Sequence, residues 1–181
     1  STINMLEANY WTPRGEYFDH QASSDSTSAK DIFDKIAEAG MGYFLLSDGL
    51  LSVGREGVKR WTGIITPQDT VEEMQTSFRV PSEDDFDGVD VKYINPVTWA
   101  EETVQCRTPE NPFPRKTEAY TIDVVMTADR AWRIGMRRLM KYLHQRRTYT
   151  ATTAMLGWCH DFGDHIILSD DIRTGKTQSC L

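Results

Sequence analysis

Val89-Asp90-Val91-Lys92-Tyr93-Ile94-Asn95-Pro96 is the stretch that decides the fold of this 181-residue chain. Its apolar and charged residues alternate, as they do in a half-buried strand, and Asn95-Pro96 is a turn signal. The chain then returns through residues 98–107, which also have strand character. The segment therefore predicts an antiparallel hairpin with one face turned toward a core.

A long amphipathic helix is predicted downstream, over residues 128–146, with Thr127 as its N-cap. At about 100° per residue, one side of this helix is expected to be core. That side consists of Ala131, Trp132, Gly135, Met136, Leu139 and Leu143. A narrow basic stripe is expected on the opposite side, made of Arg130, Arg133, Arg137, Lys141 and His144. Ile134 is the single apolar residue beside the stripe.

A shorter helix is predicted over residues 28–40, because Ser28 and Asp31 have the spacing of a capping box and Gly40 is a usual terminator. Its apolar face is expected to be Ala29, Ile32, Phe33, Ile36 and Ala37. The Asp48-Gly49 step that follows lies between two apolar runs and predicts a second hairpin.

Further strands are predicted at 61–65, 120–126, 147–151 and 164–168, while 71–78 fits either a helix or a strand. The expected fold class is therefore α+β, a β-rich module with hairpins packed by two helices. Residues 1–27 are poorly patterned and are read as an N-terminal segment and linker. Residues 28–80 then form a helix-plus-hairpin subdomain and residues 81–181 a β-rich subdomain with the basic helix; one interleaved domain is the alternative.

Charge is distributed unevenly along the chain. The formal net charge is −7, yet residues 128–147 contain seven Lys or Arg against one Asp. Nucleic-acid readers are usually basic overall, so this pattern favours a docking surface on another protein over nucleic-acid binding. A purely solvated face is an equal alternative for the basic stripe.

The chain has neither a secretory signal nor an apolar run near the ~18 residues of a membrane span, so no membrane anchor is expected. It also lacks an initiator Met, and we expect it to be a piece of a longer protein. The three cysteines are widely spaced and form no CxxC pair, which favours a reducing compartment during synthesis.

Two clusters imitate metal sites. Cys159-His160-Asp161 and Asp164-His165 contain zinc-ligand types, but their spacing fits no recognised zinc pattern, so scaffolding in a turn and strand is favoured. Asp85-Phe86-Asp87-Gly88 resembles part of a calcium loop, but Ile94 stands where that loop needs Glu. A solvated acidic loop is favoured there. We expect no metal, no cofactor and no catalytic residues.

Aromatic residues supply a further expectation. Trp61, Trp99 and Trp132 are expected to fill cores, and interfaces are the alternative.

Several stretches together resemble one protein family. They are 28–40 with the Asp48-Gly49 hairpin, Ile65-Thr66-Pro67, Ser77-Phe78, 89–96, Ala131-Trp132-Arg133 and 163–168. In order and spacing they resemble the phage-lambda J-like tail-tip proteins and the related putative phage tail protein family, over roughly four-fifths of the chain. Two features depart from the family pattern: Phe162 stands where proline is common, and residues 1–27 match nothing in it.

The resemblance implies a baseplate hub module with tail-tube-like sheets, arranged as a ring of three subunits at the tail tip. The hypothesis is therefore a virion structural protein that acts in tail assembly and is not an enzyme. Its expected partners are other tail proteins and two further copies of itself, with no nucleic acid. It is expected in the virion, at the tip that serves host attachment, and in the host cytoplasm during assembly.

The expected assembly interface consists of Arg130, Arg133, Ile134, Arg137 and Lys141. Two alternatives remain at this point. One is a metal-dependent hydrolase domain of a tail tip that uses Cys159, His160 and His165. The other is a nucleic-acid-binding adaptor that uses the basic stripe.

Overall fold

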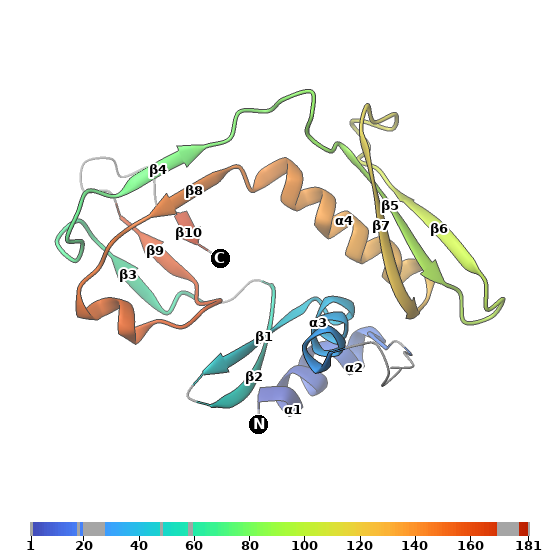
Figure 1. The fold of residues 1–181 in the computed structure, drawn as a ribbon, viewed down its shortest axis with the longest axis horizontal. Coiled ribbons are helices and arrows are strands. Elements are labelled where there is room, and N and C mark those ends of the chain that lie inside the picture. The colour runs from blue at the N-terminus through green and yellow to red at the C-terminus, as the bar shows by residue number, and fades with distance from the viewer. Residues whose placement is uncertain are drawn as a thin grey trace. The chain divides into compact units, whose positions relative to one another are not determined.

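The computed structural model describes residues 2–17, 19, 28–47, 49–57, 60–169 and 178–180. The chain divides into two compact units (Figure 1). Unit 1 comprises residues 1–55 and 81–145, and unit 2 comprises residues 56–80 and 146–181. Each unit therefore contains residues from both of the expected subdomains, 28–80 and 81–181. Helices and several small sheets make up the described residues, so the expected α+β class is confirmed.

A three-stranded sheet forms the centre of unit 1. Strand β5 (Gly88–Ile94) lies between β6 (Glu101–Cys106), which is antiparallel to it, and β7 (Thr117–Val125), which is parallel. The predicted hairpin is thus β5–β6. Val89 and Val91 are fully buried, and the charged residues between the buried positions face the other way.

Helix α4 (Ala128–His144) packs on the buried face of this sheet, and the two share one core. The helix approaches the sheet closely at Gly135, where an added Cβ would lie 2.4 Å from Val91 Cγ2 and 2.5 Å from Cys106 Sγ. Leu139 is fully buried one turn further along. No helix among the described residues is both long and apolar enough to cross a membrane.

The helix is rotated relative to the expected wheel. Ala131, Gly135 and Leu139 are buried as expected, but Trp132 is 44% exposed, whereas Arg130 and Ile134 are buried. The physical reason is that α4 has a second packing partner, the region around the C-terminal end of helix α3 (Ala29–Ala39), in addition to the sheet. Thr127 occupies the N-cap position, but its side chain makes no capping hydrogen bond.

Helix α3 begins with the predicted capping box. The backbone N–H of Asp31 donates to Ser28 Oγ at 3.2 Å, and that of Ser28 donates to Asp31 Oδ2 at 3.3 Å. The predicted hairpin follows as β1 (Gly42–Ser47) and β2 (Leu50–Arg55), with Gly49 at φ 76° in the turn. Asp48 of the turn motif lies outside the described residues.

The buried face of α3 differs from the expectation. Ala37 and Ala39 are buried, whereas Phe33 is 39% exposed and Ile36 is 37% exposed. The Phe33 ring instead packs on the ring of Phe44 from β1, with 5.2 Å between their centroids. The expected burial of Phe33 and Ile36 is therefore wrong, because small residues bring the α3 backbone close to its neighbours.

Truncation of Phe33 to Ala is accordingly expected to cost only about 1 kcal/mol of unfolding free energy, the scale of one aromatic pair. A fully buried Phe would cost about 3–5 kcal/mol. Urea denaturation of the two proteins measures the difference. Lys30→Ala, on the exposed side of the same helix, is the control and should change stability by less than about 0.5 kcal/mol.

The N-terminal segment is helical where the sequence is weakly patterned. It consists of α1 (Thr2–Leu6), the π-helical turn η1 (Glu7–Trp11) and α2 (Thr12–Arg14). Trp11 Nε1 donates to the carbonyl oxygen of Gly40 at 3.3 Å, and Asp19 forms a β-bridge with Val125 at the end of β7. The segment is therefore part of unit 1. Residues 20–27 of the expected N-terminal segment and linker lie outside the described residues.

Unit 2 contains two small sheets. In one, β9 (Ile166–Leu168) lies between β3 (Gly63–Ile65), which is parallel to it, and β10 (Gln178–Cys180), which is antiparallel. In the other, β4 (Gln75–Phe78) pairs with β8 (Arg147–Thr150). The short 3-10 helix η2 (Met155–Cys159) follows β8. The ambiguous segment 71–78 thus ends in a strand.

Candidate functional site

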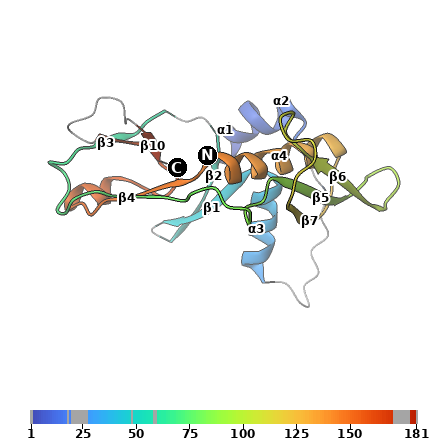
Figure 2. The same ribbon diagram turned by 90° about the horizontal axis from the view of Figure 1, so that it is seen from above.

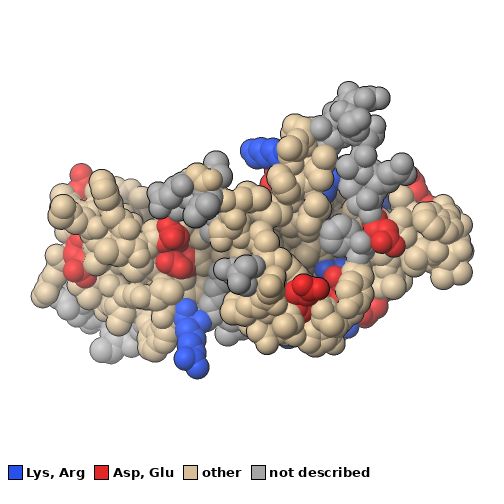
Figure 3. Space-filling model, turned by 90° about the horizontal axis from the view of Figure 1, so that it is seen from below, with Lys and Arg blue, Asp and Glu red and all other residues tan. Residues whose placement is uncertain are grey.

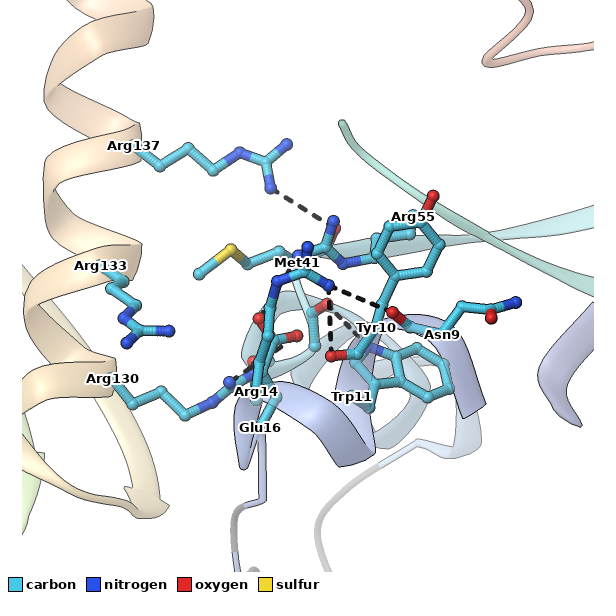
Figure 4. Close-up of polar contacts among 12 residues, drawn as sticks. Asn9, Tyr10, Trp11, Arg14, Glu16, Met41, Arg55, Arg130, Arg133 and Arg137 are labelled. Carbon is cyan, nitrogen blue, oxygen red and sulfur yellow. Dashed lines mark hydrogen bonds and ion pairs between the residues drawn. The ribbon is translucent and has the colours of Figure 1, made fainter. Parts of the chain in front are cut away.

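The basic side of α4 lies beside the N-terminal segment and the end of α3 (Figure 4). The guanidinium of Arg130, whose side chain is only 4% exposed, donates to the carbonyl oxygen of Ala39. Arg137 donates to the carbonyl oxygen of Met41 at 3.5 Å. Both acceptors lie at or just beyond the C-terminal end of α3, where unpaired carbonyl groups and the helix dipole favour cations.

One buried carboxylate faces these arginines. Glu16 Oε1 lies 3.3 Å from Nη2 of Arg55, and Glu16 Oε2 lies 3.9 Å from Nη1 of Arg130. The side chain of Glu16 is 2% exposed, so water screens these contacts little. Gly15 ends α2 in the left-handed conformation, with φ 59°, and so turns the chain toward α4. We call Glu16, Arg55, Arg130 and Arg137 the arginine cluster.

Cations outnumber the carboxylate in the arginine cluster. Burial lowers the pKa of the Arg130 guanidinium; Glu16 opposes that effect, and the charges of Arg133 and Arg55 add to it. Burial and the charge of Arg55 likewise lower the pKa of Arg137. Arginine nevertheless stays charged at neutral pH. The cluster therefore depends on Glu16 for compensation of buried positive charge.

An aromatic ring covers part of the cluster. The guanidinium of Arg55 lies 4.9 Å from the centre of the Tyr10 ring, and that of Arg14 lies 5.0 Å from it. Arg14 also donates to the carbonyl oxygens of Asn9 and Tyr10, each at 3.4 Å. These cation–π contacts join η1 and α2 to β2.

The residues of the expected interface differ in exposure, because the N-terminal segment and the end of α3 cover part of the basic side of α4. Arg130 and Ile134 are buried inside unit 1, so neither presents an outward side chain. Arg133 has a 44% exposed side chain and pairs with Asp129 at 2.9 Å, an exposed i,i+4 pair worth roughly 0.3–0.5 kcal/mol. Arg137 and Lys141 are half-buried. Burial and the charges of Arg137 and Arg138 lower the pKa of Lys141.

Sequence reasoning missed Arg138, which lies on the sheet side of α4. Its guanidinium donates twice to the Glu118 carboxylate of β7, at 2.7 and 2.8 Å, and the hydroxyl of Tyr142 donates to the same group at 3.0 Å. Burial opposes the ionisation of Glu118, but these hydrogen bonds outweigh it and lower its pKa. The i,i+4 spacing of Arg138 and Tyr142, which places both side chains on one side of the helix, was the one feature of the sequence that could have indicated a shared partner.

A pH dependence follows from Glu118. Because its folded-state pKa lies below the usual value of about 4.3, its stabilisation is complete above that value and is lost as the pH falls through the folded-state pKa. Glu118→Gln should cost about 1 kcal/mol at neutral pH, and the deficit should shrink in acid. Urea denaturation at a series of pH values measures this, with Glu110→Gln on an exposed loop as the control. A deficit that stayed constant with pH would contradict the assignment.

The expected metal-ligand types are dispersed in unit 2. Cys159 is exposed, while His160 Nδ1 lies 3.9 Å from Asp164 Oδ2, which also accepts from the backbone of Asp161 at 3.1 Å. The His160 ring packs against Gly63, where an added Cβ would lie 2.4 Å from it. Across the ranges that the structure describes, no three His, Cys, Asp or Glu side chains are grouped to hold a metal ion.

The acidic loop before β5 has a different role from the one expected. Asp87 accepts from the backbone N–H groups of Arg115 and Lys116, at 2.9 and 2.8 Å, and from Asn111 Nδ2 at 3.0 Å. Burial opposes the ionisation of Asp87, but these bonds lower its pKa. Asp87 therefore ties two loops together, whereas Glu83 and Asp84 nearby are almost fully exposed.

The three tryptophans expected in cores are exposed instead. Trp61 is 65% exposed, Trp99 73% and Trp132 44%. On the face drawn in Figure 3, the charged side chains of the described residues lie singly or in small groups among uncharged ones. That face shows no broad basic surface of the kind that tracks nucleic acid.

Comparison with known proteins identifies relatives. A solved structure, the tail protein from Neisseria meningitidis MC58, is similar with a TM-score of 0.53 and 13% sequence identity, over 82% of this chain and 45% of that one. This similarity concerns the fold, and the chain spans less than half the length of that protein. No curated protein matches the sequence.

A family model supplies the identification. The family described as "Putative phage tail protein" matches residues 28–178, which excludes the N-terminal segment with Glu16. The match covers most of the chain and agrees with the resemblance found in the sequence. The chain therefore belongs to this family of phage tail proteins.

Proposed function

We propose that the chain is a structural module of a phage tail tip or baseplate hub, and that it acts in tail assembly without catalysing a reaction. The observation that carries the proposal is the family match over residues 28–178. In this proposal the protein forms a ring of three copies in the virion, contacts other tail proteins, and belongs to the tail end that serves host attachment.

The docking surface in this proposal is the outward part of the basic stripe. Arg133 has a 44% exposed side chain, and the half-buried Arg137 and Lys141 follow it at successive turns of α4. Arg130 and Ile134 support this surface from inside unit 1. An acidic neighbour would meet positive charge here, and such steering weakens with salt, because exposed charges are screened beyond about 8–10 Å.

The test is Arg133→Glu in the full-length protein of a phage that assembles tails. The isolated protein should keep its circular dichroism spectrum and melting temperature, because only an exposed pair is lost. The yield of complete tails should fall by about tenfold or more, equivalent to a docking loss of ~1.4 kcal/mol.

The matched control is Lys92→Glu. Lys92 is exposed on the face of β5 that points away from α4, so the same change of charge occurs on another surface of unit 1. It should leave the tail yield unchanged. Normal yields from both variants would remove the basic stripe from the mechanism, and absence of the protein from purified tails would overturn the structural role itself.

A further inference from the structure

Two exposed tryptophans of unit 1 each lie near a charged residue, and the two charges are opposite in sign. Trp99 precedes exposed Glu101 by two positions, and Trp132 directly precedes Arg133. Exposed aromatic residues with neighbouring charges are typical anchors of protein interfaces. We propose that the turn between β5 and β6 of one copy docks on the first turns of α4 of a second copy. Trp99 then meets Trp132 and Glu101 meets Arg133; the inference rests on the proposed function.

The turn is held rigidly by one carboxylate. Glu102 Oε1 accepts from Asn95 Nδ2 at 2.9 Å and from Thr98 Oγ1 at 3.1 Å, and its Oε2 accepts from the hydroxyl of Tyr93 at 2.9 Å. Asn95 Oδ1 in turn accepts from the backbone of Val97 at 2.9 Å. A turn that is already ordered loses little conformational freedom on binding, so more of its contact energy remains available for docking.

The backbone of Trp99 has a conformation that is unfavourable for a residue with a side chain. Its φ is 53°, in the left-handed region that favours glycine, and its amide donates to the carbonyl oxygen of Asn95 at 2.9 Å. Backbone strain of this kind persists where the surrounding bonds impose it, and it gathers at functional sites. Val97, two residues earlier, is 85% exposed, so the turn presents two apolar side chains to solvent.

The chain itself supplies a complementary surface. The side chains of Arg133 and Asp129 are 44% and 69% exposed, so Arg133 can exchange this weak partner for Glu101 of another copy. Trp132 beside them offers an exposed ring for stacking against Trp99. A partner with an exposed ring next to a cation therefore complements the exposed ring and the negative charge of the turn.

Within one chain the turn lies away from Trp132, although β5 leads into it beside the start of α4, where the backbone N–H of Met126 donates to the carbonyl oxygen of Ile94 at 3.1 Å. Cys106, at the far end of β6, donates from Sγ to the carbonyl oxygen of Trp132 at 3.5 Å. At about 3.3 Å per strand residue, the length of β6 separates this point from the turn by roughly 20 Å. Figure 2 shows the β5–β6 turn projecting away from α4. The contact therefore joins different surfaces of two copies, an arrangement that closes into a ring when the rotation permits.

The test measures self-association of the full chain by sedimentation velocity over a concentration series. Trp99→Ala, Glu101→Arg and Arg133→Glu should each weaken association by about tenfold or more. The double variant Glu101→Arg with Arg133→Glu restores opposite charges across the contact and should recover most of the association. A double variant as weak as either single variant would overturn the pairing, as would a wild-type chain that stays monomeric throughout.

Two further variants separate docking from folding. Trp99→Gly removes the ring and suits the positive φ, so its melting temperature should equal or exceed that of the wild type while association is lost. Trp158→Ala is the matched control, since Trp158 is 95% exposed but belongs to unit 2, and it should associate normally. Normal association of Trp99→Gly would contradict the proposal.

The outcome also separates this inference from the proposed function. If Arg133→Glu prevents tail assembly but Glu101→Arg does not, α4 docks on a different partner: the proposed function stands and the turn is excluded. If the chain is absent from tails yet the charge exchange restores association, the surfaces are right and the tail role is wrong.

Discussion

Replacement of Leu139 by Asp is expected to unfold unit 1. Leu139 is fully buried between α4 and the β6–β5–β7 sheet. Removal of a buried Leu side chain alone costs about 2–5 kcal/mol. A carboxylate at the same position must also lose its hydration with no described cation directed at it, which adds several kcal/mol. The sum reaches the roughly 5–15 kcal/mol that stabilise a typical domain.

Circular dichroism and urea denaturation measure the Leu139→Asp effect. The spectrum of the variant should lose most of its helical signal at 25 °C. Trp132→Ala is the control on the same helix, because Trp132 is substantially exposed, and it should cost no more than about 1 kcal/mol. Equal losses from both variants would mean that the rotation of α4 described here is wrong.

Glu16→Gln is the second substitution with a large expected effect. It keeps the size of the side chain but removes the carboxylate that, among the described residues, pairs with both Arg55 and Arg130. Loss of one partner from a buried pair leaves uncompensated charge and typically costs about 3–5 kcal/mol. Thermal and urea denaturation measure the loss. Glu7→Gln, on the exposed side of η1, should be nearly neutral.

A double-mutant cycle tests the cause of the Glu16 effect. If buried positive charge is responsible, Arg55→Met should recover part of the stability lost in Glu16→Gln, because it removes one of the uncompensated cations. Additive losses in the double variant would instead indicate that the carboxylate acts through packing alone.

Local patterns in the sequence predicted the elements of unit 1 well. The Ser28–Asp31 capping box, the alternation in 89–93 and the turn at Asn95-Pro96 each depend on residues close together in the chain. Such signals survive in the fold because neighbouring residues satisfy them. The order of these elements also sufficed for the resemblance to the putative phage tail protein family, and the match over residues 28–178 confirms membership of that family.

The basic side of α4 was less predictable, for a physical reason. A helical wheel shows which residues share a side, but it does not show how many partners the helix has. Arg130 is buried by groups far away in sequence, Ala39 and Glu16, and Glu16 belongs to a segment with little apolar pattern. The expected burial of the three tryptophans was wrong for a related reason: a large apolar side chain is buried on average, but its type alone does not decide where it lies in a given fold.

The interleaved path of the chain has a consequence for its synthesis. Unit 1 needs residues 81–145 as well as 1–55, so the first part cannot complete its core until residue 145 has left the ribosome. At about 5–20 residues per second, translation of residues 56–145 takes roughly 5–20 s. During that delay Glu16 and Arg55 can pair, but Arg130 and the sheet under α4 are not yet available. A nascent chain stalled just after residue 80 should therefore be sensitive to protease, whereas one stalled late enough to release α4 should resist it.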